Sequence, residues 1–444
     1  MKTRILFILI TLLCAGLVGV QSARAATITV TNTNDSGAGS LRQAIADANP
    51  GDTIDFAVAT PATITLTSGE LVVGKSLTIN GPAGGHLSIS GNAASRVFYV
   101  CCGSVTISNL TITNGNNGGI LHEGYSGFDP LTINNCTISG NTAPQIGGGI
   151  TNVDATLIIN NSTISGNSAT WNGGGIYTDG AISTESATAT ITNSTFSDNY
   201  AYYGGGIWNG YISAGLTIGN TIFRAGDIAD GNGGYGPLTS LGYNISDGAG
   251  GGMLTGPGDQ TFTDALLGPL QDNGGPTFTH ALLAGSPAID AGDPSFTPPP
   301  YYDQRGPGFA RVVNGRMDIG AFEVQPESPT SCAAQVQAPI NADGSSVFNA
   351  RRGVVPVKFR LTCNGVSTCD LPPATIAVTR TAGGVIGTVN ESVYSSQADS
   401  GPNFRTLDCQ YHYNLNSGAL GVGTYRVDIL IDGQVVGSAT FQLR

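Results

Sequence analysis

Three carboxylates in the middle of the chain have the residue type and spacing that hydrolysis of a glycosidic bond requires. That reaction uses two carboxyl groups about 5 to 10 Å apart on one face. Asp154 and Asp179 follow two copies of a repeated segment at nearly the same offset, and Glu185 is close in sequence. Adjacent copies would bring these acids to one surface. They form a candidate site for a polysaccharide hydrolase, and the plainer interpretation is that they are solvated loop acids.

Lyase chemistry on acidic sugars has other requirements. A cation must neutralise the substrate carboxylate, and a basic side chain must take the proton beside it. No lysine occurs between Lys75 and Lys358, and Arg224 is the single arginine of residues 105–247. The paired aspartates and Gly-His-Gly motif of polygalacturonases are also missing. These absences predict a protein without catalysis, with the hydrolase as the alternative.

Aromatic residues gather beside glycine-rich turns and form a candidate ligand-binding site. An exposed aromatic ring can stack on the apolar face of a sugar. Alternatively, the rings cover loop backbone or stack on one another. The candidates are Trp171, Tyr177, Tyr202, Tyr203 and Trp208, with Tyr200 and Tyr211 nearby.

Metal ligands are less well defined, and no cofactor is predicted. The four histidines lack zinc spacing, and the pair His122-Glu123 is interpreted as polar residues of a surface loop. Structural calcium is an alternative at Asp290, Asp293 and Asp303, because extracellular modules hold calcium through such oxygens. An ion pair of Asp303 with a nearby arginine, Arg305 or Arg311, is the plainer interpretation.

A repeated segment must position these residues. Its five copies have the form Leu131-Thr-Ile-Asn-Asn-Cys-Thr-Ile, and the central asparagines are 26, 26, 32 and 27 residues apart. Strands and turns at this period predict a right-handed parallel β-helix. Isoleucines of successive copies would stack in its core. Asparagine tolerates left-handed backbone angles, and its amide can bond to the next coil. This predicts a ladder of Asn109, Asn135, Asn161, Asn193 and Asn220.

The N-terminus predicts export. Lys2 and Arg4 precede an apolar run, and Ala23-Arg24-Ala25 fits a cleavage site, so residues 1–25 are expected to be a signal peptide of a secreted or cell-surface protein. No later segment is long enough to span a membrane. The formal charge of −12 argues against a nucleic acid partner. Residues 40–48 predict a short amphipathic helix that covers the first coil, with Ser40 and Gln43 as a capping box.

Seven cysteines follow the predicted signal peptide. Export makes disulfides plausible, and the four cysteines after residue 330 allow three pairings. We favour Cys363 with Cys369, because the intervening residues read as a turn, and Cys332 with Cys409. The odd number leaves at least one thiol free or intermolecular. Cys136 is expected to be a small buried side chain.

The repeats resemble those of the polymorphic outer membrane proteins. The motif Phe-x-x-Asn appears as Phe196-Ser-Asp-Asn199, and Gly-Gly-apolar-apolar as Gly174-Gly-Ile-Tyr177 and Gly205-Gly-Ile-Trp208. Members of that family are surface adhesins with a C-terminal membrane barrel, and no such barrel is expected in this chain. The resemblance implies the solenoid architecture and a role in adhesion.

Two further resemblances concern the C-terminal part. The succession that ends in Asp303-Gln-Arg-Gly306 and Asp318-Ile-Gly-Ala-Phe-Glu323 resembles the choice-of-anchor Q domain of secreted β-helix proteins, over about residues 262–323. Val355-Pro-Val-Lys-Phe359 and the final hairpin resemble the PxKF domain of exported bacterial proteins. Alternating strands there predict an immunoglobulin-like sandwich. The expected divisions are a β-helix at 26–323, a linker at 324–331 and a sandwich at 332–444.

Together these features predict an all-β extracellular protein. The leading hypothesis is adhesion without catalysis, in which one face of the β-helix binds a polysaccharide or a cell-surface component. The alternative is a glycoside hydrolase on the same fold.

Overall fold

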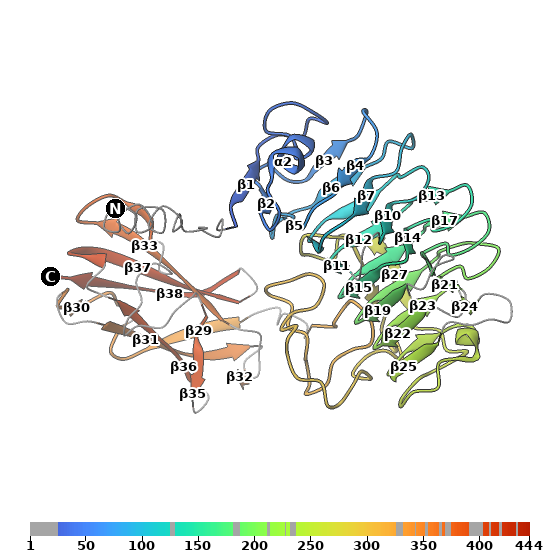
Figure 1. Cartoon of the computed structure of the whole chain (residues 1–444). Helices are drawn as coiled ribbons and strands as arrows, with labels where there is room; N and C mark the ends of the chain where they lie inside the picture. Colours follow the sequence, from blue (N-terminus) through green and yellow to red (C-terminus); the bar gives the residue numbers. More distant parts are fainter. Residues whose placement is uncertain are drawn as a thin grey trace, which may run out of the picture. The chain divides into compact units, whose positions relative to one another are not determined.

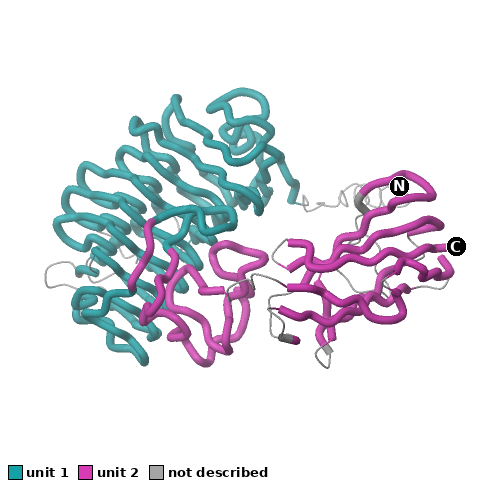
Figure 2. The backbone as a smooth tube through the Cα atoms, turned by 180° about the vertical axis from the view of Figure 1, so that it is seen from behind, with its two compact units in different colours: residues 1–265, 270–280 teal, residues 266–269, 281–444 magenta. Residues whose placement is uncertain are grey.

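The chain folds into two compact units, which are residues 1–265 with 270–280 and residues 266–269 with 281–444 (Figure 2). The computed structural model describes residues 25–444 except 125–128, 181–186, 211–213, 227, 231–236, 326–331, 342, 351–353, 364–365, 369–373, 390–402, 408–409, 417–419 and 432–433. The predicted signal peptide therefore lies outside the described residues, apart from its last position. The division does not coincide with the expected boundaries at 323 and 332, which stay predictions.

Three parallel sheets, here named A, B and C, form the first unit (Figure 1). Sheet A contains β1 (Thr27–Val30), β2 (Thr53–Phe56), β5 (Leu77–Asn80), β8 (Val105–Ser108), β11 (Pro130–Asn134), β15 (Thr156–Asn160), β19 (Thr188–Thr192), β22 (Gly215–Gly219) and β25 (Leu238–Gly242). Sheet B contains β3 (Ala62–Thr65), β6 (Leu87–Ser90), β9 (Thr111–Thr113), β12 (Thr137–Ser139), β16 (Thr163–Ser165), β20 (Thr195–Ser197), β23 (Ile222–Arg224) and β26 (Ile245–Ser246).

Sheet C closes each coil. It contains β4 (Leu71–Val73), β7 (Phe98–Cys101), β10 (Ile120–Glu123), β14 (Ile150–Val153), β18 (Ile176–Asp179), β21 (Ile207–Asn209) and β24 (Ile228–Asp230). Two short strands, β13 (Thr142–Ala143) and β17 (Ser168–Ala169), pair between sheets B and C. The chain visits A, B and C in turn and every pairing in these sheets is parallel between successive coils, so the predicted all-β parallel β-helix is confirmed.

Stacked apolar side chains form the core of the β-helix. Ile133 pairs in register with Ile107 on one side and with Ile159 on the other. All three are fully buried. A second column of stacked apolar side chains lies in sheet B and ends in Phe196 and Phe223. The ring centroids of these two residues are 4.9 Å apart. Burial of this kind stabilises by about 1.5–3 kcal/mol for each large apolar side chain.

The predicted asparagine ladder occupies the corner between sheets A and B. All five asparagines have positive φ angles, between 52° and 58°. The amide of Asn161 donates to the Oδ1 of Asn135 over 3.0 Å, and that of Asn220 donates to Asn193 over 3.0 Å. Asparagine is suited to this corner because it adopts the left-handed conformation at little cost and its amide links neighbouring coils.

The short helix α2 (Leu41–Asp47) lies at the end of the β-helix formed by β1 and β4 (Figure 1). Leu41, Ala44 and Ile45 are buried in the core cluster. Ser40 accepts a hydrogen bond from the Gln43 backbone N–H, whereas the Gln43 side chain donates to Asp47, so half of the expected capping box forms. The helix shields the first coil, as predicted.

Residues 270–280 return along sheet B and cover part of its outer surface. The Thr137 hydroxyl donates to the Phe278 carbonyl over 2.6 Å, and Ser165 Oγ lies 2.9 Å from His280 Nε2. Further along, His86 Nε2 lies 3.0 Å from Asp272. The segment includes parts of the hairpin β27 (Leu267–Gln271) and β28 (Thr279–Leu282), while η1 (Gly250–Gly252) is a single 3-10 turn. The chain itself therefore occupies part of the outer face of sheet B, at β12 and β16, whereas Thr63 and Thr65 of β3 remain exposed.

The second unit contains a β-sandwich of immunoglobulin type, as predicted. One sheet has the order β29 (Cys332–Gln337), β31 (Val354–Cys363), β36 (Gln410–Asn416) and β35 (Arg405–Leu407), with β32 (Val366–Thr368) on β31. The other has β30 (Ser346–Phe348), β38 (Gln434–Leu443), β37 (Gly423–Ile431), β33 (Thr375–Ala382) and β34 (Gly387–Val389). Alternating residues of β31 are buried in the core between them, including Phe359, which stacks on Tyr411.

The disulfide pairing differs from both pairs expected. Cys332 is bonded to Cys363, and their Cα atoms are 4.1 Å apart. The two residues face each other in the antiparallel pairing of β29 with β31. This bond uses one cysteine from each expected pair, so Cys363–Cys369 and Cys332–Cys409 cannot form beside it. The spacing of cysteines along the chain does not reveal the strand register that brings Cys332 and Cys363 together. Cys369 and Cys409 lie outside the described residues.

Candidate functional site

Four exposed aromatic residues form one cluster on the loops that lead from sheet B to sheet C. Trp171 precedes β18, and Tyr200, Tyr202 and Tyr203 precede β21 on the next coil. The Tyr203 N–H donates to the Trp171 carbonyl over 2.8 Å, so these two residues are neighbours along the coil axis. We name these four residues the aromatic cluster.

Three rings of the aromatic cluster contact one another, and all four remain open to solvent. Trp171 and Tyr202 have their centroids 6.1 Å apart, and Tyr202 and Tyr203 lie 4.5 Å apart, both edge to face. The exposed fractions are 55% for Trp171 and 65% for Tyr202. Large exposed apolar groups gathered in this way are typical of binding sites on soluble proteins.

The other two predicted aromatic residues form a separate pair. Tyr177 and Trp208 occupy paired positions on the outer face of β18 and β21, and their rings stack 4.7 Å apart at 6°. Trp208 is only 7% exposed, so its ring offers little surface to a ligand. The structure thus divides the five predicted residues into an exposed group of three and a stacked pair. Ligand binding by either remains a prediction.

Glycine triplets hold the loops of the aromatic cluster in place. A Cβ atom added to Gly174 would lie 2.4 Å from the Tyr200 carbonyl oxygen and 2.6 Å from that of Gly205. The Gly174 N–H also donates to the Gly204 carbonyl of the next coil. Only glycine allows the two backbones to approach so closely. The triplets therefore align the aromatic loops of adjacent coils.

Two of the three candidate catalytic acids lie on adjacent coils, as the repeat offset predicts. The backbone N–H of Asp154 donates to the carbonyl of Asp179 over 3.1 Å. The Asp179 side chain is 8% exposed and accepts a hydrogen bond from the Tyr177 hydroxyl over 2.7 Å. Glu185 lies outside the described residues. The structure brings Asp154 and Asp179 together at the end of sheet C.

A second pair of tyrosine and carboxylate on sheet C was not anticipated. The Tyr99 hydroxyl donates to Glu123 over 2.9 Å. Glu123 and Asp179 belong to one outer column, because both pair with Val153 of the strand between them. Two strand spacings of about 4.8 Å therefore separate their backbones. Alignment of Gly118-Gly-Ile120 with the later glycine-isoleucine motifs would have placed Glu123 in this column.

His122 is not in a surface loop, contrary to the interpretation of the sequence. It lies on β10 with 1% of its surface exposed, and its Nδ1 is 2.9 Å from Asn152 Oδ1. Burial lowers the pKa of His122, against the hydrogen bond to Asn152, which raises it. Alternation along β10 turns His122 inward and Glu123 outward. His122 is a structural residue of the interior.

The three candidate calcium ligands are not brought together. Asp303 is fully buried and forms an ion pair with Arg305 at 2.6 Å. Asp293 accepts from the Ser295 backbone and hydroxyl, and Asp290 accepts from Asn314. Among the described residues no group of three or more His, Cys, Asp or Glu is arranged to hold a metal ion. The ion pair proposed as the plainer interpretation is the arrangement observed.

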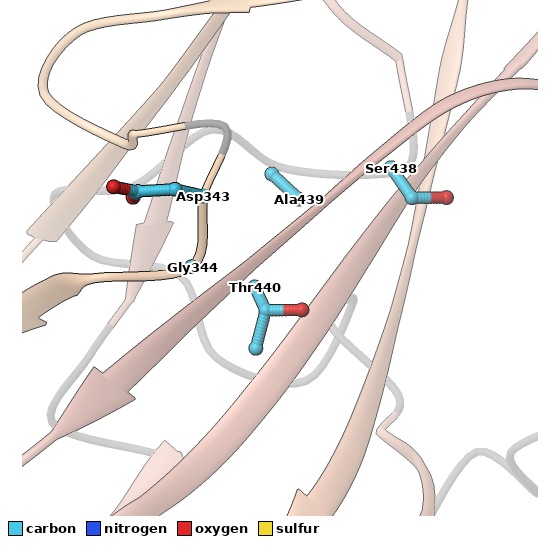
Figure 3. Close-up of a pocket in the computed structure, with 5 residues that line it drawn as sticks. All are labelled: Asp343, Gly344, Ser438, Ala439 and Thr440. Atoms are coloured by element: carbon cyan, nitrogen blue, oxygen red, sulfur yellow. The ribbon is translucent and has the colours of Figure 1, made fainter.

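A hollow of about 360 Å³ lies in the sandwich, between the turn at Asp343 and strand β38 (Figure 3). Figure 3 shows the Asp343 carboxylate and the Ser438 hydroxyl pointing in opposite directions. Each has another partner, because Asp343 accepts from Ser345 and Ser438 donates to Asp428 over 2.5 Å. Hydrogen bonds from Ser345 lower the pKa of Asp343. The hollow therefore lacks a pair of converging catalytic groups.

The three sheets and their parallel pairing between successive coils define the class of this protein as a parallel β-helix. Pectate lyase Pel9A is similar over 68% of this chain and 97% of its own, with 13% identity and a TM-score of 0.28. This likeness concerns the fold. No known family profile and no curated protein sequence matches the chain.

The comparison also corrects one prediction. The chain was predicted to have no catalytic activity, and that prediction is contradicted because the similar fold found belongs to an enzyme. The activity in that structure's title is a property of Pel9A. In the described part of this chain, no helix is both long and apolar enough for a membrane span.

Proposed function

We propose that the protein binds a polysaccharide through the aromatic cluster. The observation that carries the proposal is the exposure of four aromatic rings on adjacent coils, between 53% and 69% each. Sugar rings have an apolar face that stacks on aromatic rings, and their hydroxyls can bond to tyrosine hydroxyls. Glycine-fixed loops hold the rings in position before the ligand arrives, which lowers the entropic cost of binding.

Charge favours a neutral polysaccharide as the ligand. The formal charge of the chain is −12, and the nearest stretch of repeats contains the single arginine Arg224. Arg224 lies 3.7 Å from Asp198, so its charge is already partly neutralised. A polyanionic chain would gain little attraction and would be repelled by the net charge. We therefore place neutral glycans ahead of polyuronates.

Motifs support a more specific proposal about the setting. The repeats resemble polymorphic outer membrane proteins, residues 262–323 resemble a choice-of-anchor Q domain, and residues 332–444 resemble a PxKF domain. These resemblances and the apolar N-terminus support an exported protein of the cell surface that adheres to a glycan. The N-terminal sequence of the exported chain tests this, with Ala26 expected as its first residue.

Affinity electrophoresis of residues 26–444 through gels that contain one polysaccharide each tests binding. The panel includes a β-glucan, a xylan, a glucomannan and polygalacturonate. We expect a neutral glycan to retard the protein, and Trp171→Ala and Tyr202→Ala to weaken binding about tenfold or more, because central aromatic contacts contribute about 1.4 kcal/mol or more each.

Tyr301→Ala is the matched control, since Tyr301 is 68% exposed and lies outside the aromatic cluster. It should bind like the wild type. The proposal fails if no polysaccharide retards the protein, or if the cluster variants and the control behave alike.

Hydrolysis of the bound polysaccharide is a second candidate function. Asp154 and Asp179 on adjacent coils favour it, together with the Tyr177 hydroxyl that bonds to Asp179. Release of reducing ends from the polysaccharide that binds, lost in Asp179→Asn while binding is kept, is the expected result. Binding without any release of reducing ends contradicts this candidate and leaves polysaccharide binding intact.

A further inference from the structure

Two adjacent cysteines, Cys101 and Cys102, end strand β7 and begin the turn to β8. Cys102 has a φ of 66° and Gly103 one of 88°, so two consecutive residues are left-handed. The Gly103 N–H donates to Asp129 over 2.7 Å, and the Ser104 N–H donates to Ser76 over 3.1 Å. Hydrogen bonds to two neighbouring segments of the chain therefore hold the backbone of this turn, and the turn keeps the two thiols next to each other.

The two thiols are accessible and interact with each other. Cys102 is exposed and Cys101 is half-buried, whereas Cys136 is buried and Cys332 is already bonded to Cys363. Burial raises the pKa of the Cys101 thiol, and its hydrogen bond with Cys102 adds to this effect. Cys101 is thus the weaker nucleophile toward an external reagent at neutral pH. Among the described cysteines, this pair alone combines contact with exposure.

Adjacent residues make an unusual disulfide. Their Cα atoms are about 3.8 Å apart across a trans peptide bond. Ordinary disulfides have Cα atoms about 4.4–6.8 Å apart, and shorter spacings make the bond easier to reduce. A bridge between these two residues would therefore be reduced more readily than a buried structural disulfide.

We propose that Cys101 and Cys102 form a redox-active vicinal pair, which closes to a disulfide by exchange with a small external disulfide. The exposed Cys102 thiolate attacks one sulfur of the reagent, forms a mixed disulfide and expels one thiolate. Cys101 then loses its proton and attacks Cys102 Sγ, which expels the second thiolate. Two protein thiols are oxidised by two electrons, and one small disulfide is reduced to two thiols.

Reaction with the aromatic disulfide DTNB, which releases a coloured thiolate at each exchange, tests the proposal on residues 26–444. The double variant Cys101→Ser/Cys102→Ser supplies the baseline for the other cysteines. Above this baseline, the wild type should release two coloured thiolates and retain none on the protein. Cys101→Ser should release one and retain one as a stable mixed disulfide on Cys102.

Mass spectrometry of the chymotryptic peptide 100–110 gives the second readout. It contains both cysteines and should lose two hydrogen atoms in the oxidised wild type, then regain them with a mild reductant. A wild type that retains the aromatic thiol on Cys102 would overturn the proposal. Disulfide-linked dimers that disappear in Cys102→Ser would overturn it too. The DTNB reaction and the mass measurement do not depend on polysaccharide binding. Failure of the redox proposal can therefore be distinguished from failure of the proposed function.

Discussion

At the residue scale, the asparagine corner has two separable contributions to stability. Asn135 has a φ of 52° and accepts the Asn161 amide over 3.0 Å. The backbone contribution comes from tolerance of the left-handed conformation, and the side-chain contribution comes from the hydrogen bond between coils.

Substitution of Asn135 separates these contributions. Both Asn135→Ala and Asn135→Gly remove the amide, but only alanine is strained at positive φ. We expect alanine to lower the free energy of unfolding by about 1 kcal/mol more than glycine. Urea unfolding followed by circular dichroism measures the difference. Equal effects of the two substitutions would show that the conformation contributes nothing.

Buried carboxylates in the second unit give a prediction for pH. Burial raises the pKa of Glu323 from 4.5 to about 9, against the Arg311 charge, which lowers it. Burial likewise raises the pKa of Asp318 from 3.8 to about 6. Below about pH 4 both folded and unfolded chains hold these protons. As the pH rises toward 9 the unfolded chain releases them first, so the contribution to stability is progressively lost.

Calorimetry at pH 5 and pH 8 tests this linkage. We expect the melting transition that includes this unit to fall by several degrees at the higher pH, since about 1 kcal/mol shifts Tm by about 2–4 °C in a domain of this size. Glu323→Gln removes the titrating group and should reduce the shift. A shift of the same size in the variant would contradict the assignment to Glu323.

At the element scale, the glycine triplets determine whether the aromatic loops stack. Gly174→Ala places a methyl group 2.4 Å from the Tyr200 carbonyl oxygen. We expect a loss of roughly 1–3 kcal/mol in unfolding free energy, measured in urea, because the coils must separate to admit the methyl group.

Gly84→Ala is the matched control for this substitution. Nothing lies within 4 Å of a Cβ atom at Gly84, and its φ is not positive. It should change stability by less than about 0.5 kcal/mol. Equal losses in the two variants would mean that close approach of the coils is not the reason for glycine at position 174.

The repeats predicted the strands of sheets A and B well, because each copy contains both strands and the corner between them. Sheet C was harder to predict. Its strands follow Gly-Gly-Ile motifs at a variable distance from the asparagines, so His122 was assigned to a loop although it is buried on β10. Alignment on those motifs would have corrected the error from sequence alone.

Other features depend on register or on distant segments and could not be predicted from local patterns. The Cys332–Cys363 bond follows from the pairing of β29 with β31. The covering of sheet B by residues 270–280 joins positions more than a hundred residues apart, such as Thr137 and Phe278. Burial of Trp208 likewise could not be predicted from its place beside a glycine triplet.

At the scale of the whole molecule, the proposed polysaccharide-binding surface is one that the chain leaves uncovered. Residues 270–280 cover part of the outer face of sheet B, whereas the aromatic cluster is open to solvent. The chain has two tryptophans, and they differ sharply, with 55% of Trp171 and 7% of Trp208 exposed. Trp171 is therefore a natural reporter for the cluster.

Iodide quenching of tryptophan fluorescence, with and without a saturating polysaccharide that retards the protein, tests whether the polysaccharide covers the aromatic cluster. Iodide should quench Trp171 in the free protein, and the quenched fraction should fall when the polysaccharide binds. In Trp171→Phe little quenching should remain in either state. If the polysaccharide binds and the quenched fraction of the wild type is unchanged, the ligand lies elsewhere, and binding at the aromatic cluster is contradicted.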